Sequence, residues 1–533
     1  MTGLAGTGAL ARLAMRRDRI GLPVALYLIT AVVAGNTYSL RHLYPTPAAR
    51  VSLAASGGSN PSFLFLYGRL EGTSLGAVSA WRYAVWAAIF ASLMSIFLVV
   101  RHTRADEEAG RLELVGSAAV GRHAPLTAGL AVASAASGVL AAALAVVLIL
   151  LGLPAGGSVA FALAITTCSL AFAFVTALAA QLVPGARAAR GIAIAALGAA
   201  FLLRAIGDAA GAHGPSWLTW LSPLGWTELT RAYAGDRWWV LALPVALSLA
   251  AGAGAYALAA IRDHGAGLVP YRPGRPRAGA ALRGPLGLAW RLQRATLSAW
   301  ALGFAVTFAA SGAAAKGIGG LFGGSQQLRE AFLRMGGQPG ITNAYLAALM
   351  SLAGLGAAAY ATSAVLRLRS EETAQLAEPV LAAGTGRARW VLSHVTVALA
   401  GTAALLALGG AAAGLGYGLR AGNLGTEVGR LAAAAIAQLP ASLAIAAVAA
   451  AAFGLLPRAA TALGWSVTGA VFVIGWFGEV LRFPRWLLDV SPFTHVPKLP
   501  GGTVTAAPLL WLSGIAAALC VAALASFRRR DVG

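Results

Sequence analysis

Two clusters of acidic residues in matching order are the most distinctive reactive groups of this chain. Only 18 of its 533 residues are Asp or Glu, yet RADEEAGRLELVGSAAVGR (104–122) and RSEETAQLAEPVLAAGTGR (369–387) each hold a Glu pair, a third Glu and a closing Gly-Arg. The matched residues are Glu107, Glu108, Glu113 and Arg122 in the first stretch, and Glu371, Glu372, Glu378 and Arg387 in the second. The repetition indicates two similar sites.

Each stretch predicts a short amphipathic helix with carboxylates on its polar faces. In the second stretch Pro379 predicts that the helix kinks or stops at Glu378. Ionised carboxylates on a rigid helix form strong, directional bonds with Arg or Lys of a soluble partner. In the alternative interpretation the acids only balance nearby arginines, namely Arg101, Arg104, Arg111 and Arg122. Because the cluster occurs twice, at matching positions, docking of a partner is the favoured interpretation.

Other reactive side chains give no indication of an active site. The seven His are scattered, and Cys168 and Cys520 lie in apolar segments, so neither a metal site nor a disulfide framework is predicted. The only lysines, Lys316 and Lys498, do not follow a G-x-x-x-x-G pattern. This excludes ATP binding through a phosphate-binding loop.

The elements that position the acidic clusters are transmembrane helices. The chain is 58% hydrophobic and 11% charged, whereas a soluble domain carries roughly 25% charged residues. The net charge of +22 fits basic residues at span ends better than nucleic-acid binding. Apolar stretches long enough to cross a bilayer recur throughout. We predict an all-α polytopic membrane protein with twelve spans, near residues 20–40, 78–100, 126–152, 157–183, 189–208, 238–261, 300–320, 343–366, 391–418, 431–456, 459–481 and 508–527.

The twelve predicted spans fall into two groups of six, separated by a Pro/Gly/Arg-rich stretch that indicates a linker. The predicted domains are a first transmembrane half (1–265), a cytoplasmic linker (266–285) and a second half (286–533). Six spans return the chain to its starting side, so the halves are parallel repeats. The excess of basic residues in the termini, the 101–122 loop and the linker places both termini and both acidic loops in the cytoplasm.

Further matches support an internal repeat. SWLTWLSPLGW (216–226) matches RWLLDVSPFTH (485–495) after the fifth span of each half, which predicts re-entrant external caps with a helix break. The cap residues are Trp217, Ser222, Pro223, Trp486, Ser491 and Pro492. Near these caps, two predicted ion pairs either hold the cap or contact substrate: Arg204 with Asp208, and Glu479 with Arg482. ARLAMRRDRI and AWRLQRATL, before spans 1 and 7, predict amphipathic elbow helices in the cytoplasmic interface.

This order of features resembles the permease subunits of ATP-binding-cassette exporters, most closely the fused twelve-span exporters of polyketide antibiotics, the tetronasin type. The resemblance covers essentially the whole chain. In that family the segment after the second span of each half is a coupling helix seated in a cleft of the nucleotide-binding subunit. The resemblance implies ATPase coupling by Glu107, Glu108, Gly110, Arg111, Glu113, Arg122, Glu371, Glu372, Glu378 and Arg387. The second copy has Ala374 and Gln375 where the first has Gly110 and Arg111.

The same resemblance implies a cargo pathway and partners. In this permease class the second and fifth spans of each half line the pathway, although aromatic series at helical spacing usually serve packing or lipid contact. The candidate pathway residues are Trp86, Phe90, Met94, Phe97, Phe201, Trp465, Phe472 and Trp476. No cofactor is expected in this chain. ATP and Mg²⁺ are expected in a separate nucleotide-binding ATPase subunit, present in two copies.

The expected function is therefore that of a permease subunit, not an enzyme, in the bacterial cytoplasmic (inner) membrane. It would export hydrophobic small molecules such as antibiotics. Two alternatives remain open. A proton-coupled secondary drug transporter needs titratable carboxylates at mid-membrane depth, and most spans offer essentially none. A membrane scaffold or sensor without transport is the other alternative.

Overall fold

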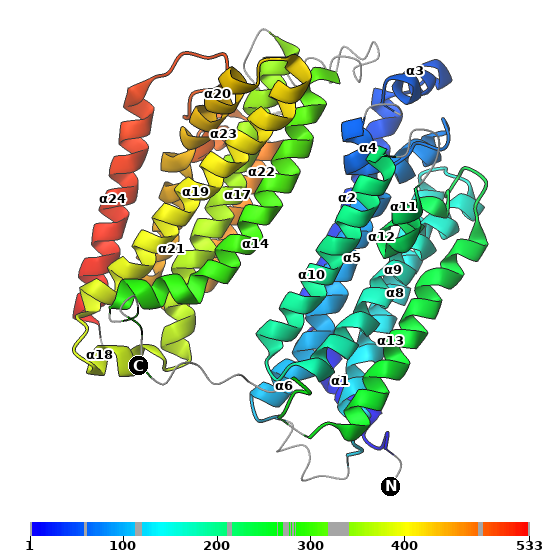
Figure 1. Ribbon diagram of the computed structural model, residues 1–533, viewed down its shortest axis with the longest axis horizontal. Helices are drawn as coiled ribbons and strands as arrows, with labels where there is room; N and C mark the ends of the chain where they lie inside the picture. Colours follow the sequence, from blue (N-terminus) through cyan, green and yellow to red (C-terminus); the bar gives the residue numbers. More distant parts are fainter. Residues whose placement is uncertain are drawn as a thin grey trace. The chain divides into compact units, whose positions relative to one another are not determined.

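The computed structural model describes residues 3–57, 61–111, 120–210, 216–263, 265–269, 284–317, 340–477 and 483–530, together with 277, 279 and 282. Within these ranges all regular secondary structure is helical, as predicted. The chain divides into two compact units, unit 1 (Met1–Gly274) and unit 2 (Arg275–Gly533), both drawn in Figure 1.

Unit 1 consists of long apolar helices with short helices at both ends. Its elements are α1 (Thr7–Arg17), α2 (Gly21–Leu43), α3 (Pro47–Gly57), α4 (Pro61–Tyr67), α5 (Leu75–His102), α6 (Arg104–Glu108), α8 (Ala124–Leu150), α9 (Ala155–Leu182), α10 (Ala186–Ala210), α11 (Trp217–Leu221), α12 (Pro223–Leu229), the 3-10 helix η1 (Trp238–Leu241) and α13 (Ala242–Ile261). Within this unit α1 and α6 lie at one end of the long helices, and α3, α4, α11 and α12 lie at the other (Figure 1). The first acidic segment and the predicted cap are therefore at opposite ends.

Helix α9 is the centre of unit 1, where it packs against α5, α8 and α13. Small residues let these helices approach closely. On α9, the Ser169 hydroxyl donates to the Ala91 carbonyl of α5 and lies 2.8 Å from the Ser95 hydroxyl. A Cβ on Gly157 would lie 2.2 Å from the Tyr233 ring, so only glycine fits there. Close contacts of this kind act together with larger buried side chains of α9, such as Phe161 and Phe172.

Unit 2 has the same kind of construction. Its elements are α14 (Pro285–Ala314), η3 (Ala315–Gly317), α17 (Ile341–Thr373), α18 (Ala377–Ala382), α19 (Arg387–Ala421), α20 (Leu424–Ile436), α21 (Leu439–Leu455), α22 (Ala460–Phe477), α23 (Arg485–Leu488), η4 (Pro492–Thr494) and α24 (Ala506–Arg529). Helix α18 and the C-terminal end of α24 lie at the same end of this unit (Figure 1).

The most extensively packed helix pair among the described residues of unit 2 is α14 with α19. A Cβ on Gly416 would lie 2.0 Å from the Ala309 carbonyl oxygen, and one on Gly312 would lie 2.1 Å from that of Ala413. Glycine on each side therefore permits backbone contact between the two helices. On the other side of the unit, α21 packs against α17 and α24.

Eleven helices among the described residues are long and apolar enough to cross a membrane, and each overlaps a predicted span. The remaining predicted span, 459–481, corresponds to the shorter apolar helix Ala460–Gly475 within α22, and residues 478–482 lie outside the described ranges. The predicted amphipathic segments differ in form. In unit 1 the segment is the separate helix α1, whereas in unit 2 it is the beginning of the continuous, 30-residue α14.

Candidate functional site

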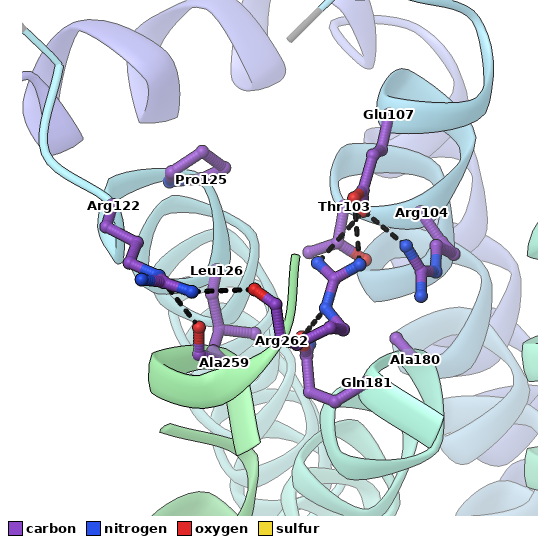
Figure 2. Close-up of a pocket in the computed structure, with 10 residues that line it drawn as sticks. All are labelled: Thr103, Arg104, Glu107, Arg122, Pro125, Leu126, Ala180, Gln181, Ala259 and Arg262. Carbon is purple, nitrogen blue, oxygen red and sulfur yellow. Dashed lines mark hydrogen bonds and ion pairs between the residues drawn. The ribbon is translucent and has the colours of Figure 1, made fainter. Parts of the chain in front are cut away.

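The first acidic cluster lies where α5 ends. Thr103 interrupts the helix with φ −121° and ψ −87°, and the chain continues into α6. The Glu107 carboxylate of α6 accepts a hydrogen bond from Arg104 Nη1 (2.7 Å) and two from Arg262, at 2.8 and 3.1 Å. It also accepts one from the Gly265 backbone N–H at 2.6 Å. Figure 2 shows Glu107 between the two guanidinium groups. Bidentate pairing of this kind fixes geometry as well as charge.

Arg262 connects this carboxylate to two long helices. It directly follows α13, and its Nε donates to Gln181 Oε1 near the end of α9 (3.0 Å), as Figure 2 shows. The buried Arg104 donates to the carbonyls of Val183 (2.8 Å) and Ala266 (2.7 Å). The ends of α5, α9 and α13 are therefore joined by one cluster. We call Arg104, Glu107, Gln181 and Arg262 the unit 1 clasp.

Arg122 binds the same end of α13. Its Nε donates to the Ala259 carbonyl (3.0 Å) and its Nη2 to the Arg262 carbonyl (2.6 Å) (Figure 2). Carbonyls at the C-terminal end of a helix have no intrahelical donor, and a nearby cation stabilises them. Because Arg122 lies just before α8, it ties the start of α8 to the end of α13.

The second acidic cluster repeats this arrangement. Glu372, near the end of α17, accepts a hydrogen bond from Arg369 (2.9 Å) and forms an ion pair with Arg530, which follows α24. The Arg530 guanidinium lies 5.1 Å from the centroid of the Phe453 ring. Arg387, at the start of α19, donates to the Arg530 carbonyl (2.7 Å). We call Arg369, Glu372 and Arg530 the unit 2 clasp.

By its contacts, Glu107 of unit 1 corresponds to Glu372 of unit 2. Each lies three residues after its arginine partner, and each binds the arginine that follows the last long helix of its unit. Three residues further on, Gly110 (φ 70°) and Gln375 (φ 56°) both turn the chain in the left-handed region. Alignment of the acids alone placed Glu107 opposite Glu371, one position away. Adjacent glutamates point about 100° apart around a helix. Their order in the sequence therefore does not reveal which of the two faces the end of the last long helix of the unit.

Neighbouring acids connect to the amphipathic segments, directly in unit 1 and through His394 of α19 in unit 2. Asp106 accepts from Arg17 of α1 at 2.8 Å. In unit 2, the Glu371 carboxylate lies 3.4 Å from His394 Nε2, and Nδ1 of the same ring lies 3.1 Å from Gln293 of α14. The first acidic cluster therefore contacts both the end of α13 and α1, whereas the second contacts the end of α24 directly and reaches α14 through His394.

The side chains of Glu107, Glu371 and Glu372 are almost fully covered by their own chain. Glu108 and Glu378 are exposed, although one Glu108 oxygen accepts from the Ala186 N–H (3.0 Å). These two residues and the exposed Arg111 are charged groups of the acidic segments that a partner could reach. Glu113 lies outside the described residues.

The candidate pathway residues of unit 1 differ in exposure. On α5, Phe90 and Phe97 are about half exposed and Met94 is buried. Trp86 lies against Phe201 of α10, with ring centroids 6.0 Å apart. Trp86 and Phe201 therefore pack against each other and are partly covered, whereas Phe90 and Phe97 present the most open surface of the five.

The candidate residues of unit 2 lie on α22. Trp465 and Phe472 are both partly exposed, and the side chain of Trp476 lies outside the described residues. Phe472 lines a cavity of about 560 Å³ that is also bordered by α14 and α17, through residues such as Trp300 and Phe304. A largely apolar, aromatic cavity of this size suits a small hydrophobic ligand.

The predicted cap of unit 1 is a break between α11 and α12. The buried Ser222 hydroxyl donates to the Ala200 carbonyl of α10 (2.6 Å) and accepts from the Gly225 N–H (3.2 Å). Pro223 is the first residue of α12, where its missing N–H costs nothing, and Trp217 is exposed. Ser222 and Pro223 therefore act in helix capping.

The predicted cap of unit 2 is less regular. Ser491 is buried and Pro492 begins the 3-10 helix η4, while Trp486 of α23 is exposed. The predicted pair Glu479 and Arg482 lies outside the described residues.

A buried ion cluster joins the unit 1 cap to α10. Arg204 Nη1 lies 3.0 Å from Glu228 of α12 and 3.8 Å from Asp208, and Nη2 donates to the Phe65 carbonyl of α4 (2.9 Å). Thr219 of α11 donates to Asp208 (2.8 Å). Burial raises the pKa of Glu228 well above its ordinary value, although Arg204 acts in the opposite direction.

Comparison with known proteins identifies the family. Residues 282–528 match the family model described as "Multidrug efflux system permease Rv1217c, C-terminal domain". The whole chain is 42% identical over 533 residues to the "Multidrug efflux system permease protein Rv1217c" of Mycobacterium tuberculosis, covering 100% of this chain and 96% of that protein. The chain belongs to this family of multidrug efflux permeases. Membership confirms the prediction of a membrane permease for drug export.

Several residues of the permease's polar clusters were not predicted from the sequence, Arg262, Arg530 and Glu228 among them. Arg262 and Arg530 each follow the last apolar helix of a unit, and they were counted only as basic residues that set orientation. Glu228 was overlooked because it lies outside the predicted spans, six residues after Ser222. Arg262 directly follows predicted span 6 and Arg530 is the last of three arginines after predicted span 12, so basic residues at both positions were a usable signal.

Proposed function

We propose that this permease is the transmembrane subunit of an ATP-driven exporter of hydrophobic small molecules. The observation that supports this most is the pair of clasps. In each unit, the segment after the second long helix is tied to the end of the last long helix by one Glu–Arg pair, Glu107–Arg262 and Glu372–Arg530. A push on either segment therefore reaches the last helix of its unit.

The source of this force is a separate nucleotide-binding ATPase, present in two copies, one for each acidic segment. The exposed Glu108 and Glu378 would pair with basic residues of the ATPase, and the covered Glu107 and Glu372 would transmit the displacement. ATP and Mg²⁺ would be held by that partner, because this sequence has no phosphate-binding loop. Gly110 and Gln375, with positive φ, shape the turn that follows the Glu pair within each acidic segment.

The cargo proposed is an apolar or amphiphilic drug that enters from the cytoplasm or inner leaflet. The aromatic cavity beside Phe472 supports this, and the related protein is named as a multidrug efflux permease. Polyketide antibiotics of the tetronasin type are the narrower class we propose. Both termini would be cytoplasmic in a bacterial inner membrane, because basic residues concentrate there.

Co-purification tests the docking claim. The permease is co-expressed with a candidate nucleotide-binding subunit from the same genome. The double variant Glu108→Lys with Glu378→Lys is compared with Asp489→Lys, an exposed acid on neither segment. Charge reversal at the docking surface should lower ATPase recovery at least tenfold and abolish drug efflux, with an unchanged size-exclusion profile. Asp489→Lys should behave as the unaltered protein. Full ATPase recovery and efflux in the double variant would refute the proposal.

A proton-coupled transporter is the second candidate, and the buried acids near the cap favour it. Asp208 and Glu228 share Arg204 in a water-poor site, where carboxyl groups can carry protons. ATP-depleted membrane vesicles with an imposed proton gradient distinguish the two candidates. Drug uptake that persists there and is lost in Glu228→Gln would favour the second candidate over the first.

A further inference from the structure

A second cavity of unit 2 lies beside the Glu372–Arg530 pair. It encloses about 380 Å³ at the end of α17, the turn between α21 and α22, and the end of α24. Its lining residues are Arg369, Glu372, Leu455, Leu456, Pro457, Arg458, Ala459 and Arg530. The cavity is separate from the aromatic one at Phe472, with which it shares no lining residue.

The charges in this cavity are not balanced. Three guanidinium groups line it, and the only carboxylate among its lining residues is Glu372, which is already bound by Arg369 and Arg530. The Arg458 side chain makes no hydrogen bond or ion pair with any residue that the structure describes. The buried Arg530 Nε has no partner among the described residues. Two positive charges and free donors are therefore left for an anion.

The rim of the cavity is apolar. Leu455 and Leu456, where α21 ends, are 59% and 57% exposed and lie directly beside the arginine-bearing turn. A soluble anion would make no use of these leucines. An acyl chain running along α21, a helix apolar enough to lie in a membrane, would cover them.

We infer that this cavity binds an anionic phospholipid. The phosphodiester lies between Arg458 and Arg530, and the acyl chains lie over Leu455 and Leu456. Basic pockets between transmembrane helices at a membrane surface recognise lipid headgroups in this way. The site goes beyond the proposed ATPase coupling and does not depend on it, although Arg530 belongs to both the lipid site and the unit 2 clasp.

Binding is tested with the purified full-length chain in neutral detergent. Short-chain phosphatidylglycerol, phosphatidylcholine and inorganic phosphate are titrated separately, and the dissociation constant is followed by intrinsic tryptophan fluorescence or native mass spectrometry. Phosphatidylglycerol should bind saturably, at least tenfold more tightly than either of the other two. Inorganic phosphate alone tests the headgroup chemistry without the chains.

Two variants separate the polar and apolar parts of the site. Arg458→Gln should weaken phosphatidylglycerol binding about fivefold, the effect of one basic residue near an anionic lipid. The matched control Arg389→Gln removes an exposed arginine of α19 that does not line the cavity, and it should change nothing. Leu456→Ser should weaken lipid binding and leave the response to inorganic phosphate unaltered.

Three results would overturn the assignment. Equal affinity for phosphatidylglycerol and phosphatidylcholine would show that the negative charge of the headgroup does not contribute to binding. Equal affinity for phosphatidylglycerol and inorganic phosphate would identify a site for soluble anions. Identical affinities of Arg458→Gln and Arg389→Gln for phosphatidylglycerol would show that the lipid binds elsewhere on the chain. Arg458 is exposed and without a partner among the described residues, so its replacement should leave folding intact.

Discussion

Glu107→Gln should destabilise this permease more than Glu372→Gln, although the two carboxylates occupy corresponding places. The difference lies in the arginines left behind. Of the two partners of Glu107, Arg104 has a side chain that is only 1% exposed and Arg262 has one that is 12% exposed. The partners of Glu372 are better solvated, with side-chain exposures of 22% for Arg369 and 18% for Arg530. An unpaired cation costs most where water cannot reach it.

The magnitudes follow from this burial. Removing one member of a buried ion pair costs about 3–5 kcal/mol. Arg104 keeps hydrogen bonds to the carbonyls of Val183 and Ala266, so we expect the lower end, about 3 kcal/mol, for Glu107→Gln. For Glu372→Gln, water can solvate both arginines, and we expect about 1.5 kcal/mol, the contribution of one hydrogen bond to a charged group.

The free energy of unfolding can be measured by titration with sodium dodecyl sulfate in mixed micelles. Glu427→Gln is a suitable control, because its partner Arg430 has a side chain that is 33% exposed and the pair should contribute less than about 1 kcal/mol. Equal losses for Glu107→Gln and Glu372→Gln would refute the argument from burial. A loss for Glu427→Gln as large as that for Glu107→Gln would refute it as well.

Three further predictions concern other parts of the two units. Because burial raises the Glu228 pKa above 4.5, folded protein retains a proton that unfolded protein releases, so stability should fall as pH rises above about 4.5. Glu228→Gln should flatten that fall in a thermal-unfolding series from pH 4.5 to 8. Gly416→Ala should cost about 1–3 kcal/mol in the same unfolding assay by pushing α14 from α19, whereas Gly425→Ala, with nothing within 4 Å of its Cβ, should not. Phe472→Ala should lower the affinity for an apolar drug several-fold in a binding titration and leave the unfolding midpoint within about 2 °C.

The helices of this permease were predictable because hydrophobicity alone determines them. Apolar stretches of span length have few stable alternatives in a bilayer, since every backbone polar group must be bonded within the segment. The structure therefore has an apolar helix at each predicted span, and the one that is too short, Ala460–Gly475, directly precedes residues outside the described ranges. The break that separates α1 from α2 and is missing in α14 was not predictable, because both segments have a similar pattern.

The polar contacts were less predictable, because they depend on tertiary distance. Arg262 lies 155 residues from Glu107 in the sequence, and Arg530 lies 158 residues from Glu372. Composition and periodicity carry no information about such pairs. The internal repeat does carry such information. An arginine directly follows the last span of each half, so this feature recurs in both halves as the acidic clusters do.

The two interpretations of the acidic stretches, charge balance and docking, are compatible once burial is considered. The covered Glu107 and Glu372 neutralise arginines at the ends of long helices, which fixes the acidic segments rigidly against the bundle. The exposed Glu108 directly follows Glu107 on α6, and the exposed Glu378 lies on α18, just beyond the turn at Gln375. A docking group on a loosely held loop would absorb a displacement by bending, whereas one beside an ion pair passes it on. Internal pairing is therefore what a force-transmitting surface requires, and the presence of arginine partners within the chain does not argue against docking.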